Sequence, residues 1–117
     1  MKINGIVMKQ KFEIIFLEEA IEFMDSLDDK ARSKIFYNLE KAKFINDPKL
    51  FMKLTDDVWE FRTLYNKIQY RLFAFWDKTG NTETLVVTTH GIIKKVSKVP
   101  KNEIEKTNQI KTEYFNQ

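Results

Sequence analysis

Cysteine is absent from this chain of 117 residues, and histidine occurs once, at His90. Without cysteine the chain can form neither a disulfide framework nor a thiolate metal site, and one histidine argues against a zinc site. No apolar run approaches the roughly 20 residues needed to cross a bilayer. The N-terminus also lacks the apolar core and small-residue cleavage site of a secretory signal. We therefore expect a soluble cytoplasmic protein with no metal ion and no membrane partner.

Apolar and aromatic residues are plentiful. Hydrophobic residues make up 43% of the chain and aromatic residues 14%, ten of them phenylalanine. This composition is too apolar for a disordered chain, and the length suits one domain with a single core.

Positive charge is concentrated in the second half of the chain. Residues 1–57 hold ten Lys and Arg against eleven Asp and Glu, whereas residues 58–117 hold ten against six, which together give the net charge of +3. A basic surplus is compatible with a nucleic-acid partner, but it is also what a solvated lysine-rich surface produces. Charge alone does not decide between them.

The first half of the chain predicts a short strand followed by a helical hairpin. Residues 11–16 alternate in the manner of a strand, and the spacing then becomes helical. Asp28 is the expected N-cap of a second helix, which runs to about residue 45 and ends before Pro48. The apolar stripe of the first helix is Leu17, Ala20, Ile21, Met24 and Leu27. That of the second is Ala31, Ile35, Leu39 and Ala42.

The second half predicts three strands and a final helix. Residues 58–64 and 68–76 are separated by a hairpin turn at residues 65–67. A second tight turn at residues 77–81 leads to a β-branched strand at residues 84–90, and a helix follows Pro100 to about Phe115. The order β-α-α-β-β-β-α predicts an α+β fold, with a mainly antiparallel sheet of about four strands and the helical hairpin on one face.

Polar and cationic side chains gather on one face of the predicted sheet. Side chains alternate across a strand, so one face carries Glu60, Arg62, Gln69, Arg71, Phe73, Thr88 and His90. An arginine among aromatic residues loses hydration, and an anion opposite it compensates for that loss. This open face therefore suggests a phosphate pocket, and Phe73 would suit base stacking.

The same residues also have ordinary structural explanations. Arg62 and Arg71 could form cross-strand ion pairs with Glu60, Asp57 or Asp77. His90 could be a structural histidine, and Lys94-Lys95 could be solvated surface charge. Taken one by one, the residues leave both interpretations open.

Several short motifs, taken in order, resemble a known family. They are Trp59-Glu60-Phe61-Arg62, Tyr70-Arg71, His90-Gly91-Ile92, Lys94-Lys95 and Pro100. Their order and spacing resemble the RelE/HigB superfamily of bacterial type II toxins, and within it the phage-derived HigB-like branch. The expected order of elements agrees over residues 12–115. The resemblance implies a single RelE-like toxin domain over residues 1–117, with residues 1–8 as an extension.

The resemblance implies a metal-independent endoribonuclease, without a cofactor, that cuts mRNA on translating ribosomes. Arg71, supported by Arg62, would neutralise the charge that develops on the phosphate. His90 would act as general acid or general base, with Glu60 as a candidate for the opposite role. Lys94 would complete the catalytic set. The RNA-binding residues would be Glu60, Phe73, Lys95 and Lys98.

The resemblance also implies partners and alternatives. The partners would be mRNA, the ribosome and a cognate antitoxin encoded nearby, often a helix-turn-helix protein, which would cover the basic cleft. Relatives with this architecture that poison DNA gyrase offer a non-enzymatic alternative. An inactive phage-derived remnant is a third.

Overall fold

The computed structural model of the chain describes residues 2–80, 84–95 and 98–117. Its main feature is a five-stranded sheet of order β3-β7-β6-β5-β4, in which β3 pairs parallel with β7 and the other pairs are antiparallel. The strands are β3 (Glu13–Phe16), β4 (Phe51–Lys53), β5 (Trp59–Tyr65), β6 (Ile68–Asp77) and β7 (Leu85–Lys94). The predicted α+β class with a mainly antiparallel sheet is confirmed, with one strand more than expected.

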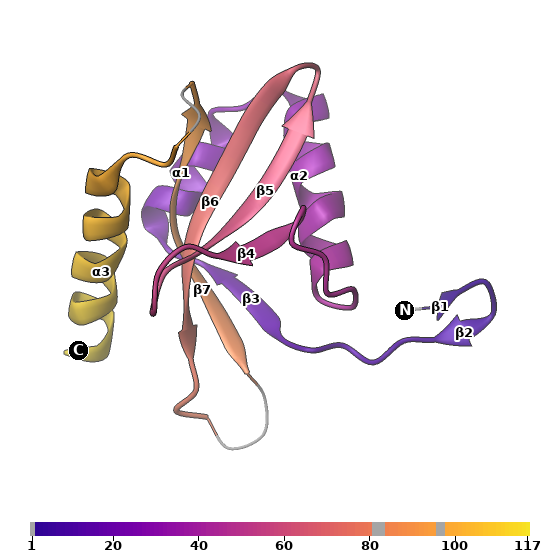
Figure 1. The fold of residues 1–117 in the computed structure, drawn as a ribbon, viewed down its shortest axis with the longest axis horizontal. Helices are drawn as coiled ribbons and strands as arrows, with labels where there is room; N and C mark the ends of the chain where they lie inside the picture. Colours follow the sequence, from indigo (N-terminus) through magenta and orange to yellow (C-terminus); the bar gives the residue numbers. More distant parts are fainter. Residues whose placement is uncertain (1, 81–83, 96–97) are drawn as a thin grey trace.

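The helices lie on both faces of this sheet (Figure 1). The helical hairpin of α1 (Glu18–Asp25) and α2 (Asp29–Ala42) covers one face, where its buried side chains join Phe61, Leu72 and Ala74 in the core. The final helix, α3 (Lys101–Phe115), packs on the other face against β6 and β7. Among the described helices, none combines the length and apolar character needed to span a membrane.

The sequence signals for the helical hairpin are largely confirmed. Asp28 caps α2, since its carboxylate accepts a hydrogen bond of 2.9 Å from the Ala31 backbone amide. The predicted α2 stripe is fully buried. In α1, Ala20 and Met24 are buried, but Ile21 is 49% exposed, so its assignment to the buried stripe was wrong. The first helix is only eight residues long, and its buried face is correspondingly narrow.

Strand ends and turns differ from the expectation in detail. Asn66 and Lys67 form a two-residue hairpin turn in which both residues have positive φ, as a primed turn requires. The last strand continues beyond the predicted residue 90 to Lys94. Edge strand β4 was not predicted. At the N-terminus β1 (Lys2–Ile3) and β2 (Ile6–Val7) form a separate hairpin. Asn81, in the second predicted turn, and Met1 lie outside the described residues.

A β-bulge in β7 changes which side chains share a face. Phe73 pairs with His90, but the next residue, Ala74, pairs with Thr88, so Thr89 is the extra residue. Thr88 therefore lies with Ala74 on the face beneath α1 and α2, where its hydroxyl donates to the Ile15 carbonyl. The prediction that Thr88 shares a face with His90 was wrong, because simple alternation does not hold across a bulge.

Candidate functional site

Arg62 and Arg71 lie directly opposite each other on β5 and β6. They are on one face of the sheet, as predicted. Two neighbouring guanidiniums repel each other, and a carboxylate between them reduces that repulsion. Glu60 provides it, with its Oε1 atom 3.3 Å from Arg71 Nε and its Oε2 atom 3.7 Å from Arg62 Nε. Of the ion pairs considered from the sequence, those of Glu60 exist: the pair with Arg71 is cross-strand, the pair with Arg62 lies within β5, and together they form one three-residue cluster.

Hydrogen bonding in this cluster is incomplete. Arg71 donates from Nη1 to the Tyr70 carbonyl at 3.0 Å and from Nη2 to the Gln69 side chain. Within the described part of the chain, the buried Nε atoms of Arg62 and Arg71 and Oε1 of Glu60 have no hydrogen-bond partner. Buried polar groups are normally paired, and here Arg71 Nε and Glu60 Oε1 face each other as an ion pair at 3.3 Å without forming a hydrogen bond.

The two arginines line one hollow of about 260 Å³, together with Lys49, Leu64 and Gln69. The side chain of Arg62 is 32% exposed, whereas that of Arg71 is 2% exposed. Arg62 is therefore the guanidinium that a ligand reaches first, and Arg71 lies behind it. Lys94 pairs with Gln69 across β6 and β7 and so extends the same face.

Burial shifts the pKa values of the cluster and of the neighbouring Lys94. It raises the pKa of Glu60, although Arg71 and Arg62 oppose the shift. Burial also lowers the pKa of Arg71 and of Lys94, and neighbouring cations act in the same direction on both. Three cationic side chains, from Arg71, Arg62 and Lys94, act on the one carboxylate of Glu60, and Lys49 lines the hollow with the two arginines, so the site is suited to an anion.

His90 is on the same side of the sheet as Arg71, because it pairs with Phe73, two residues further along β6. Its ring is buried beneath α3. Nδ1 lies 2.8 Å from the Thr89 hydroxyl, and Nε2 lies 3.4 Å from a carboxylate oxygen of Glu103. Burial, followed by the charge of Lys106, lowers the pKa of His90 against the opposing effect of Glu103. The imidazole is therefore neutral near pH 7.

The predicted open floor is thus only partly open. His90 is 3% exposed and is not among the residues that line the arginine hollow. The expectation that the face carrying Arg71 and His90 is open to a phosphate was therefore wrong at His90. Phe73 is completely buried and stacks on His90 with ring centroids 4.9 Å apart, so a base cannot stack on it in this arrangement. Helix α3, whose packing on this face was not predicted, contacts His90 through Glu103, and His90 in turn stacks on Phe73.

The remaining predicted residues lie at the edge of this face. Lys94 is half-buried, and Lys95 and Lys98 are exposed beyond the end of β7. Lys49 and Gln69 were not predicted as lining residues of the arginine hollow. For Gln69 the signal was available, because it shares the predicted face with Arg71. For Lys49, which precedes the unpredicted β4, no such signal exists.

Comparison with known proteins identifies the family. The family model described as "Phage derived protein Gp49-like (DUF891)" matches residues 22–112, which include Arg62, Arg71 and His90, all of α2 and most of α3. No curated protein matches the chain. Members of the matched family are often toxins of toxin–antitoxin systems. Because the match covers most of the sequence, this chain belongs to the Gp49-like family of phage-derived proteins.

Proposed function

We propose that this protein is the toxin of a type II toxin–antitoxin system of the RelE/HigB superfamily, and that it cleaves mRNA on translating ribosomes without a metal ion. The observation that carries the proposal is the opposed pair Arg62 and Arg71, which line one hollow with Lys49 and share a single carboxylate, that of Glu60. Paired guanidiniums are well suited to a phosphodiester, because each can donate to two phosphate oxygens. Membership of the Gp49-like family supports the assignment as a toxin.

In the proposed reaction the ribose 2′-oxygen forms a bond to phosphorus while the bond from phosphorus to the 5′-oxygen breaks. The proton of the 2′-hydroxyl passes to a base, and the departing 5′-oxygen takes up a proton. The products are a 2′,3′-cyclic phosphate and a 5′-hydroxyl. Arg62 would bind the phosphate oxygens directly, and the charge of Arg71 behind it would stabilise the transition state.

His90 is the proposed proton carrier. A neutral imidazole suits the general base, and the lowered pKa of His90 keeps it neutral. Because α3 covers the ring, the first turns of that helix would have to move for His90 or Phe73 to meet RNA. Glu60, whose pKa is raised by burial, is the candidate for the opposite proton-transfer role. The side chains of Lys94, Lys95 and Lys98 would bind the RNA backbone.

Arg62 offers the sharpest test. Removing Arg71 would leave the buried Glu60 carboxylate with less compensation and could unfold the protein. Arg62 is partly exposed, so Arg62→Gln should remain folded. In a translating extract, mapped mRNA ends should show cleavage by the wild type and a loss of about 100-fold in Arg62→Gln. Lys30→Gln, an exposed change on α2, is the matched control. Equal cleavage by Arg62→Gln would overturn the proposed role.

A second candidate function is a non-enzymatic toxin that binds DNA gyrase. The burial of His90 and Phe73 favours it, because no proton-carrying imidazole is accessible in the structure. Induction of the protein in cells separates the two functions, since rapid mRNA decay indicates the nuclease and DNA-damage signalling indicates gyrase poisoning. An inactive phage-derived remnant would produce neither.

The proposed partner is a cognate antitoxin, often a helix-turn-helix protein. An acidic segment of the antitoxin would cover the basic hollow around Arg62. Co-expression with the adjacent small open reading frame should yield a complex and suppress toxicity. Arg62→Gln should weaken that complex if the hollow is the contact, whereas Lys30→Gln should not.

A further inference from the structure

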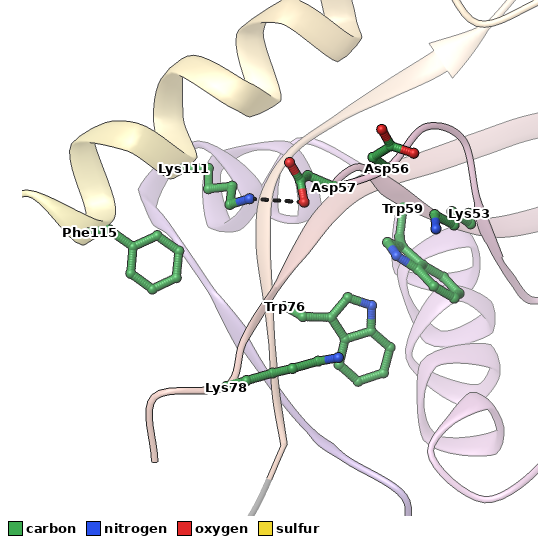
Figure 2. Close-up of a pocket in the computed structure, with 8 residues that line it drawn as sticks. All are labelled: Lys53, Asp56, Asp57, Trp59, Trp76, Lys78, Lys111 and Phe115. Carbon is green, nitrogen blue, oxygen red and sulfur yellow. Dashed lines mark ion pairs between the residues drawn. The ribbon is translucent and has the colours of Figure 1, made fainter.

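Figure 2 shows the residues that line a larger hollow, of about 510 Å³. It lies at the opposite end of the β5–β6 hairpin from the arginine hollow. Trp59 at the start of β5 and Trp76 near the end of β6 line it, whereas Leu64 and Gln69 of the arginine hollow lie next to the hairpin turn. Its volume is within the roughly 300–1,000 Å³ typical of small-molecule sites. The two hollows share no lining residue.

The two indoles form a rigid corner. Their ring centroids are 5.5 Å apart and their planes are nearly perpendicular, at 81°. Phe51 stacks on Trp59 with centroids 4.8 Å apart, and Phe12 packs against Trp76 at 5.3 Å, so both indoles are supported from the core. A planar aromatic ligand can stack on one indole while its edge meets the other.

A lysine side chain lies near each indole. Lys53 lies directly opposite Trp59 in the β4–β5 register, and the amino group of Lys78 lies over the Trp76 ring, 5.6 Å from its centroid. Within the described residues, no carboxylate comes within ion-pair distance of Lys53 or Lys78. Each of these amino groups is therefore available to an anionic group of a ligand in the hollow.

The two acidic residues that line the hollow, Asp56 and Asp57, do not form ion pairs with Lys53 or Lys78 in the described structure. Asp57 pairs with Lys111 of α3 at 3.3 Å, and Figure 2 shows this contact away from the indoles. Asp56, the other carboxylate of the lining, is exposed and turns away from the two rings (Figure 2). Neither carboxylate occupies the space beside Lys53 and Lys78.

We propose that this hollow binds a nucleotide, with the base in the corner between Trp59 and Trp76 and the phosphate on Lys53 and Lys78. An aromatic peptide side chain would use the corner but would have no need of the two lysines. The proposal does not depend on the nuclease function, because no residue of the arginine hollow takes part. The nucleotide is either free or one unit of a single-stranded RNA, and both present the same base and phosphate.

Intrinsic fluorescence provides a site-specific test, since the chain has two tryptophans and both line the hollow. The full chain is titrated with AMP, adenosine, ribose 5-phosphate and a short oligoadenylate RNA. We expect saturable quenching by AMP or the RNA, and binding of adenosine about tenfold weaker than that of AMP, because its charge-assisted contacts are missing. Ribose 5-phosphate should cause no saturable quenching. Quenching by the RNA alone identifies a strand as the ligand, and quenching by both shows that a free nucleotide suffices.

Variants test the two lysines. Both are exposed, so the double variant Lys53→Gln/Lys78→Gln should fold normally while binding AMP or the RNA about tenfold more weakly. Lys30→Gln, a matched change on the remote α2 surface, should bind like the wild type. The proposal is overturned if neither AMP nor the RNA quenches saturably, if adenosine binds as tightly as AMP, or if the double variant binds like the wild type.

Discussion

At the scale of single residues, the cluster of Glu60, Arg62 and Arg71 is costly to bury. A buried ion pair seldom stabilises a protein more than apolar residues of similar volume, because both charges lose their hydration. Two of its guanidinium Nε atoms also lack a hydrogen-bond partner in the described structure. Stability alone is a poor reason for such a cluster, and the binding of an anion by the arginines is a better one.

The single histidine makes a clear pH prediction. Since the folded pKa of His90 is lowered from 6.5, its neutral form contributes stability that is fully present above pH 6.5. Below pH 6.5 the unfolded chain takes up the proton first, so that stability is lost as pH falls through the folded pKa. Urea unfolding should therefore show a larger loss between about pH 7.5 and about pH 5 in the wild type than in His90→Gln.

An NMR titration of the one imidazole checks the cause directly. The pKa read from its ring protons should lie below 6.5 and should rise in Lys106→Gln, which removes a nearby positive charge. A wild-type pKa above 6.5 would show that the carboxylates of Glu103 and Glu19 dominate over burial.

Gly91 makes a steric prediction. A Cβ atom added at this position in β7 would come within 2.3 Å of the Phe23 ring of α1. Gly91→Ala should therefore lower the free energy of unfolding by about 1–3 kcal/mol. Chemical denaturation of Gly91→Ala, Phe23→Leu and the double variant measures this loss of stability. The smaller leucine at position 23 should relieve part of the cost of Gly91→Ala in the double variant. Strictly additive effects of the two substitutions would contradict the proposed contact.

At the scale of elements, the sequence predicted those parts of the fold that local patterns determine. The cap at Asp28, the α2 stripe and the β5–β6 hairpin follow from spacing and turn residues, and all are present. Strand β4 has only three residues, too few to show alternation. The bulge at Thr89 could not be predicted, because it depends on pairing with β6 rather than on the composition of β7.

Helix α3 is the element on which access to His90 depends. At its C-terminal end the Tyr114 hydroxyl donates a 2.7 Å hydrogen bond to Asp77 at the end of β6. Tyr114→Phe should remove about 1 kcal/mol of stability and increase amide hydrogen exchange in α3. The backbone amides of α2, which does not contact this bond, serve as the internal control. Unchanged exchange in α3 would show that this bond does not anchor the helix.

At the scale of the whole molecule, the sheet carries two polar hollows at opposite ends of one hairpin, and α3 lies between the face of the sheet and solvent. Sequence alone placed Arg62 and Arg71 together, because strand alternation holds along β5 and β6. It did not predict that α3 covers His90 or that the rings of Trp59 and Trp76 meet nearly at a right angle. Both depend on contacts between different segments of the chain, which no local sequence pattern predicts.

The most direct test concerns the arginine hollow itself. The chain has three arginines, Arg32, Arg62 and Arg71, so an NMR spectrum of arginine Nε–H groups is simple to assign. A short RNA made uncleavable by 2′-deoxy substitution at the scissile position should shift the signals of Arg62 and Arg71 and leave that of Arg32, on α2, in place. Saturable shifts confined to these two signals are the predicted result. Binding of the RNA without a shift at Arg62 or Arg71 would contradict a phosphate site there.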